Sequence, residues 1–107
     1  MKHDFSYLKT ATFRGRRFEM HWRCPSKGLP KGEYRGAASD PDDRYSGGNE
    51  LYIWPKQTDW DLVGTVAHES LHACVPSLKE EIVEDFEHDF LRLLKRMGAQ
   101  ITFQPKK

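Results

Sequence analysis

Two histidines and a glutamate occur in the spacing His68-Glu69-x-x-His72, within a stretch that should be helical. Side chains four residues apart on a helix lie one above the other, so both imidazoles can bind one metal ion. Glu69 lies about 100° further round such a helix, next to the ion without having to coordinate it. Zinc in catalytic sites commonly has three protein ligands and a water molecule. The pattern therefore predicts a Zn²⁺ site with His68 and His72 as ligands and Glu69 as the general base.

The helix that carries this motif should run from about Asp59 to Cys74. Thr58 can cap its N-terminus, with Asp61 three residues further on, and Pro76 cannot continue it. Helical spacing divides the side chains between a predicted core face and a face that contains the histidines. The core face holds Leu62, Val63, Val66, Ala67, Ser70 and Cys74, and the other face holds Asp61, Gly64, Thr65, His68 and His72. We therefore expect the metal site to lie outside the apolar core.

The third zinc ligand should come from a second helix. A turn at Pro76-Ser77 would make the two helices antiparallel and bring positions 80–88 opposite the histidines. The candidates by residue type are Glu80, Glu81, Glu84, Asp85 and His88. Glu80 would lie on the flank nearest the core, although Ser77 to Glu80 also has the form of a capping box, whereas Glu81 would lie on the opposite flank. Glu80 is the predicted ligand and Glu81 the alternate; His88 would enter only if the second helix were rotated.

The chain before the helices has the pattern of short strands. Residues 12–23 alternate loosely between apolar and polar, and residues 50–54 (Glu-Leu-Tyr-Ile-Trp) form the clearest strand. Residues 24–49 are rich in Gly, Pro, Ser and Asp and predict a long connection with one short strand near 33–36. The strand at residues 50–54 directly precedes the motif helix, where an edge strand could pair with an extended peptide, so Tyr52 is a candidate substrate-binding residue.

The second helix should present one apolar face and end at Gly98. That face holds Ile82, Val83, Phe86, Phe90, Leu93, Leu94 and Met97. A short strand at residues 101–103 would follow. These elements predict a single α+β domain over residues 1–107, with a small N-terminal antiparallel sheet followed by the motif helix and a second, antiparallel C-terminal helix. Residues 1–57 would supply the strands and the long loop, residues 58–98 the helical hairpin with the metal site, and residues 99–107 a basic tail.

Charge is distributed unevenly along the chain, although the net charge is only +1. Residues 1–36 sum to +6, residues 37–90 to −10 and residues 91–107 to +5. The acidic middle contains the metal motif, where carboxylates raise the local concentration of cations. The basic ends could make weak contact with nucleic acid, although solvated surface charge is the commoner role for such runs.

The apolar segments and the cysteines of the chain indicate the cellular compartment. No run approaches the roughly 20 apolar residues of a membrane span, and no signal peptide is evident, so we expect a cytoplasmic protein without membrane contact. Cys24 and Cys74 do not form a CxxC pair and do not indicate a cysteine metal site. Cys74, on the predicted core face, is expected to be a reduced, buried thiol.

The motif and its flanks resemble small zincin-fold proteins of phages and prophages. The similarity lies in Val66-Ala67 before the motif, in Pro76-x-Leu78 after it, and in the Glu80-x-x-Val83-x-x-Phe86 spacing that resembles ImmA/IrrE metallopeptidase-like domains. It covers about residues 50–98. The resemblance implies a minimal zincin-like fold, a Zn²⁺ cofactor and Glu80 as third ligand. The ending at residues 98–102 also resembles SprT-like domains, whose third ligand is a histidine, and in this chain that histidine could only be His88.

Three classes of function are compatible with these residues. The first is a zinc metallopeptidase that hydrolyses a peptide or protein substrate, working in the cytoplasm of a bacterium that carries a phage or prophage. The alternatives are a non-catalytic, zinc-stabilised nucleic-acid-binding module and a phage assembly module on the same fold. Glu69 favours the first class, because a purely structural site has no need of a base. Neither the substrate nor the oligomeric state follows from the sequence.

Overall fold

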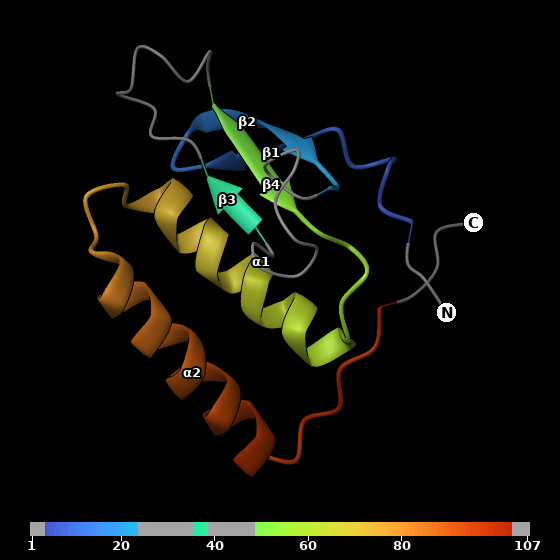
Figure 1. Cartoon of the computed structure of the whole chain (residues 1–107), viewed down its shortest axis with the longest axis vertical. Coiled ribbons are helices and arrows are strands. Elements are labelled where there is room, and N and C mark those ends of the chain that lie inside the picture. Colours follow the sequence, from blue (N-terminus) through green and yellow to red (C-terminus); the bar gives the residue numbers. More distant parts are fainter. Residues whose placement is uncertain (1–3, 24–35, 39–48, 104–107) are drawn as a thin grey trace.

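The computed structural model describes residues 4–23, 36–38 and 49–103, and these residues form three layers (Figure 1). The strands are β1 (Thr10–Phe13), β2 (Arg16–His21), β3 (Gly36–Ala38) and β4 (Glu50–Ile53), and the helices are α1 (Asp59–Cys74) and α2 (Glu80–Arg96). Helix α1 contacts β1, β3 and β4 on one side and α2 on the other. Among the described residues α2 contacts no strand, so α1 is the middle layer. The predicted α+β layout, a sheet followed by two antiparallel helices, is confirmed.

A tight hairpin joins β1 to β2. Arg14 and Gly15 both have positive φ, 52° and 78°, which is the pattern of a two-residue type I′ turn. Antiparallel pairing then puts Phe13 opposite Arg16 and Ala11 opposite Phe18.

The sheet is mixed rather than purely antiparallel as predicted. Its strand order is β1-β2-β4-β3; β1 with β2 and β3 with β4 are antiparallel, but β2 and β4 are parallel. A parallel pair requires a long crossover connection, and residues 22–49 supply one that includes β3. The predicted edge strand at residues 50–54 is therefore wrong, because β4 is hydrogen-bonded on both sides. Strand β3 is the outermost strand on that side within the described part of the chain.

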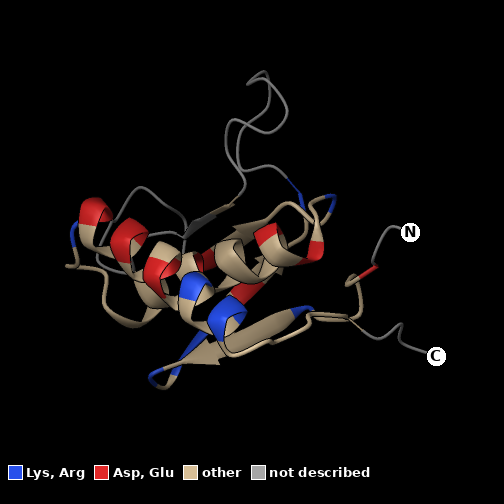
Figure 2. Cartoon of the chain, turned by 90° about the horizontal axis from the view of Figure 1, so that it is seen from below, with Lys and Arg blue, Asp and Glu red and all other residues tan. Residues whose placement is uncertain are grey.

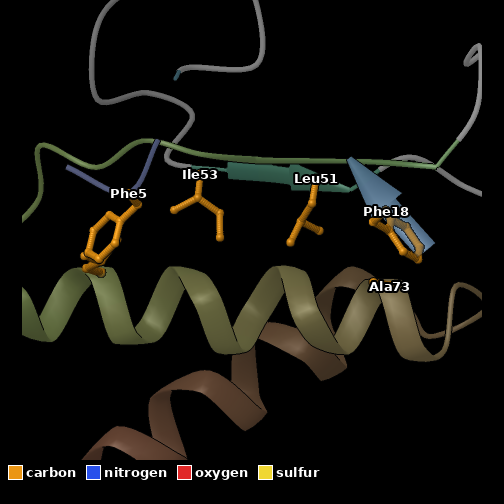
Figure 3. Packing of buried hydrophobic residues seen from close by; sticks show 6 residues of the cluster. Phe5, Phe18, Leu51, Ile53 and Ala73 are labelled. Carbon is orange, nitrogen blue, oxygen red and sulfur yellow. The ribbon is translucent and has the colours of Figure 1, made fainter. Parts of the chain in front are cut away.

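The apolar core lies between the sheet and α1. Phe18, Leu51 and Ile53 point from the strands toward the helix, where they meet Leu62 and Ala73 (Figure 3). All five are at most 1% exposed. Burying such side chains stabilises a small domain by about 1.5–3 kcal/mol each relative to exposure. The core therefore fixes which side of α1 faces the sheet.

The N- and C-terminal described segments meet at one end of this core. Phe5 packs against Trp22, with ring centroids 4.8 Å apart, and edge-on against Phe103 at 5.7 Å. Residues 101–103 do not form the predicted strand. They are attached through the Phe103 side chain, and they add no backbone ladder to the sheet.

Helix α1 begins as predicted but presents a different face to the core. Thr58 is the N-cap, and its side chain accepts a hydrogen bond from the Asp61 amide at 3.2 Å. The buried residues are Leu62, Gly64, Thr65, Glu69 and Ala73. The predicted core face was wrong, because Ser70 and Cys74 are only half-buried whereas Thr65 and Glu69 are buried. The reason is that α1 is covered on two sides, so burial does not follow a single apolar stripe. Cys74 is a free thiol, and Cys24 lies outside the described residues.

Helix α2 begins without the predicted capping box. Its N-cap is Lys79, which makes no side-chain capping bond, and the amide of Leu78 bonds back to the carbonyl of Val75. The helix ends as predicted, with Gly98 at a φ of 78° just beyond it. Acidic residues lie at its first half and basic residues in its last turn, which complements the helix dipole (Figure 2).

Only part of the predicted apolar face of α2 is covered. Val83 is fully buried, but Ile82, Phe86, Leu93 and Met97 are 43–72% exposed. Neither described helix is both long and apolar enough to cross a membrane.

Candidate metal centre

Two imidazoles of α1 and one carboxylate of α2 converge between the two helices. Glu80 Oε1 lies 2.6 Å from His68 Nε2, and Glu80 Oε2 lies 2.7 Å from His72 Nε2. The two imidazole centroids are 4.9 Å apart. Two imidazole nitrogens and one carboxylate are a donor set that suits catalytic zinc, with a fourth position left for water or substrate. The residue types therefore suit a zinc ion, although Glu80 is hydrogen-bonded to both imidazoles at 2.6 and 2.7 Å and would have to move back to the spacing of roughly 3.4 Å between zinc ligands.

Among the candidates for a third ligand, Glu80 is the one that the structure brings to the histidines. It stands at the first position of α2, where the absent capping box leaves its carboxylate free to turn toward α1. Glu81 is exposed on the same turn. His88 is also exposed and lines a separate hollow with Leu91 and Arg92 on the second half of α2.

Glu87 is part of the site, although the sequence analysis did not single it out. Its Oε1 lies 2.9 Å from His68 Nδ1. When Nδ1–H donates to this carboxylate, Nε2 keeps its lone pair and faces Glu80, which is the arrangement that commonly orients a metal-bound histidine. One signal in the sequence points to Glu87, which follows Glu80 by seven residues and therefore shares its helical face. In the structure Glu87 also lies opposite a glycine.

That glycine, Gly64, lies one turn before His68 and permits the close approach of Glu87. A Cβ at this position would stand 2.8 Å from Glu87 Oε2 and 3.0 Å from Leu91 Cδ1. Such a separation is shorter than a carbon and a carboxylate oxygen tolerate, so a larger residue would push the carboxylate aside. The sequence analysis noted Gly64 on the histidine face; the structure gives it the role of making room for Glu87.

Glu69 lies on the side of α1 that faces β3. It is 6% exposed, and its carboxylate lies within 4.8 Å of the nitrogens of both His68 and His72. Gly36 of β3 makes this packing possible, since a Cβ there would stand 2.8 Å from Glu69 Cγ. Glu69 is thus held beside the donor set by the edge of the sheet.

Burial and neighbouring charges change the proton affinity of this cluster. Burial raises the pKa of Glu69 to about 7, since the positive charge of His68 only partly offsets burial and the carboxylates of Glu80 and Glu87 raise it further. Burial lowers the pKa of His68, but the charges of Glu69 and Glu80 and the hydrogen bonds that its ring donates to Glu87 and Glu80 raise this pKa above its ordinary value overall. The metal-free cluster therefore tends to hold protons, which a cation would displace on binding.

Tyr52, the predicted substrate-binding residue, does not face this cluster. Leu51 and Ile53 point toward α1, so the intervening Tyr52 points to the opposite face of β4. There its ring stacks on His21, with centroids 4.6 Å apart. Nothing in the described residues connects its hydroxyl to Glu69 or to the histidine pair.

The predicted basic ends are described only in part. Lys2, Lys106 and Lys107, together with the lysines and arginines between residues 24 and 35, lie outside the described residues. Comparisons of the chain with protein-family models, with curated proteins and with solved structures found no match.

Proposed function

We propose that this protein is a zinc-dependent metallopeptidase whose ligands are His68, His72 and Glu80 and whose general base is Glu69. One observation carries the proposal. Three zinc-type donors converge between the helices, and a buried carboxylate outside the donor set lies within 4.8 Å of two of them. A site that only stabilised the fold would be closed by its ligands and would have no use for a buried glutamate beside it.

Zinc, when bound here, would supply a Lewis acid that activates water and polarises a peptide carbonyl. Glu69 would accept the proton of the attacking water, and a base is most effective when its pKa lies near the working pH. The same carboxyl group would then donate that proton to the departing amine. Glu87 would hold His68 in the tautomer that presents Nε2 to the site.

The position of β3 indicates where a substrate would bind. We infer that an extended peptide or protein segment pairs with the outer edge of β3, because this strand contacts Glu69 through Gly36 and is the outermost strand on that side of the described sheet. The setting in a bacterial cytoplasm, encoded by a phage or prophage, is part of the proposal and rests on the resemblance of the motif region.

The test compares the wild type with Glu69→Gln. Both proteins should bind zinc at the histidine pair, measured by elemental analysis, but only the wild type should cleave members of a peptide library, detected by mass spectrometry. Glu84→Gln, an exposed carboxylate on α2, is the matched control and should cleave like the wild type. Loss of zinc in Glu69→Gln would make Glu69 a ligand. Zinc binding without cleavage by any of the three proteins would instead support the alternative, a non-catalytic zinc-stabilised nucleic-acid-binding or assembly module.

A further inference from the structure

A second cluster of metal-type donors lies on the opposite face of the sheet. Parallel pairing of β2 with β4 sets Glu19 beside Glu50 and His21 beside Tyr52. Because Phe18 points into the core toward α1, the alternating Glu19 and His21 point away from it. The glutamates and His21 offer three ligand atoms within 4.8 Å of one another. The sheet and α1 separate this cluster from the metal centre between the helices.

The distances within the cluster are those of ligands around a cation rather than of hydrogen bonds. His21 Nε2 lies 3.5 Å from Glu50 Oε1 and 3.9 Å from Glu19 Oε2. Hydrogen bonds of this type are about 2.7–3.2 Å long. Ligand atoms placed tetrahedrally at about 2.1 Å from a zinc ion are about 3.4 Å apart. A cation between these three atoms would need only a small movement of Glu19, whose side chain is 71% exposed and free to adjust.

The imidazole nitrogen in this cluster is buried without a hydrogen bond. Among the described residues, His21 Nε2 has no hydrogen-bond partner although it is inaccessible to solvent. Its ring is held in place by stacking on Tyr52, at an interplanar angle of 18°. A buried polar nitrogen without a partner destabilises the fold, and a bond to a metal ion would remove this cost.

The two carboxylates add a second unfavourable feature that a cation would relieve. Glu19 and Glu50 stand directly opposite each other on neighbouring strands, and like charges in this position destabilise a sheet. The Tyr52 hydroxyl lies 3.5 Å from Glu50 Oε2, and the other oxygen, Oε1, lies 3.5 Å from His21 Nε2. The imidazole and both carboxylates are therefore arranged around one point.

We propose that Glu19, His21 and Glu50 form a second zinc site, independent of the site between the helices. One imidazole and two carboxylates suit a divalent transition-metal cation such as Zn²⁺. The protein would then bind two zinc ions per chain. A cation here would join β2 to β4, which pair in parallel in the described part of the sheet, and would stabilise β4, one of the strands that α1 contacts.

The experiment is a zinc titration of metal-free protein followed by calorimetry and elemental analysis. The wild type should bind two equivalents, and His68→Ala and Glu19→Gln should each bind one. His21→Ala should also lose one equivalent. Glu19→Gln is the sharper variant, because its exposed side chain has no part in the core, and it should weaken the second equivalent at least about tenfold. Glu84→Gln should keep both equivalents.

Thermal unfolding gives a second readout, because zinc should reverse which of the two proteins, Glu19→Gln or the wild type, is the more stable. With a chelator present, Glu19→Gln should be at least as stable as the wild type, because it removes a repulsion between like charges. With zinc present, the wild type should be the more stable of the two, because binding adds to folding. Two equivalents retained in both Glu19→Gln and His21→Ala would overturn the second site. So would a single wild-type equivalent that is lost in His68→Ala, and that result would leave the proposed catalytic site intact.

Discussion

Replacing Glu69 by glutamine should stabilise the metal-free protein at alkaline pH, although the same change should abolish hydrolysis. Burial raises the pKa of this carboxyl to about 7 in the folded protein, whereas its ordinary value is 4.5. The folded state therefore binds this proton more tightly than the unfolded state does. Below pH 4.5 the Glu69 carboxyl is protonated in both states and does not change the free energy of unfolding. As the pH rises from 4.5 to about 7, only the unfolded state releases the proton readily, so the folded protein loses stability. Above pH 7 this loss of stability is complete.

The size of the effect follows from the two pKa values. Each pKa unit corresponds to about 1.4 kcal/mol, so the difference between them is worth about 3 kcal/mol at pH 8. Glutamine has nearly the shape of the protonated acid and carries no charge at any pH. The unfolding free energies of Glu69→Gln and the wild type should therefore agree near pH 4 and diverge by up to about 3 kcal/mol at pH 8, with the variant the more stable.

Urea unfolding of chelator-treated protein at intervals between pH 4 and pH 8 measures this difference. Glu84→Gln, at an exposed position, should follow the wild type at every pH. Saturating zinc should remove the advantage of Glu69→Gln, because a cation beside the carboxylate favours its charged form. A constant difference between Glu69→Gln and the wild type across the pH range would refute the reasoning, since it would mean that burial does not raise the pKa of Glu69.

Other substitutions test the donor set and the residues that position it. Glu80→Gln should weaken zinc binding by at least about 100-fold, whereas Glu81→Gln should change it less than threefold; a larger loss from Glu81→Gln in a zinc titration would reverse the assignment of the third ligand. Glu87→Gln should weaken zinc binding by about 10–100-fold without removing a ligand. Gly64→Ala should also weaken zinc binding, because its side chain would displace Glu87. In a protein that already carries Glu87→Gln, Gly64→Ala should not weaken zinc binding further. Additive losses of zinc affinity in the double variant would show that Gly64 does not act through Glu87.

The sequence was sufficient for features that depend on local signals. Thr58 predicts where α1 begins, because its side chain can cap the helix, and Pro76 predicts where α1 ends, because proline cannot continue a helix. The structure confirms both, since α1 runs from Asp59 to Cys74 with Thr58 as its N-cap. The same local logic correctly ended α2 at Gly98, where the chain needs a positive φ. A local signal failed at Ser77, because the Leu78 amide bonds back to Val75 in the turn after α1, and Lys79 rather than Ser77 is the N-cap of α2.

Features that depend on distant pairing were beyond the sequence pattern. The parallel alignment of β2 with β4 requires a long connection between the two strands, and no periodicity in the sequence encodes this pairing. Glu19 lies beside Glu50 only because of this register. Since the sequence does not reveal the register, neither residue was predicted as a ligand. Glu87 was missed for a related reason: its partner His68 belongs to the other helix, and the rotation of α2 about its axis decides which acidic residue faces it.

Two glycines explain why a single hydrophobic stripe was the wrong description of α1. Gly64 admits Glu87 on the side facing α2, and Gly36 of β3 admits Glu69 on the side facing the sheet. The helix therefore carries polar groups on both of its covered sides, and each group is held where the backbone of α1 or β3 carries no side chain. A Gly36→Ala change should push β3 away from Glu69, expose this carboxylate and return its pKa toward 4.5, which titration of the metal-free variant by NMR can measure. A Glu69 pKa that stays near 7 in this variant would mean that the cover on Glu69 comes from a source other than β3.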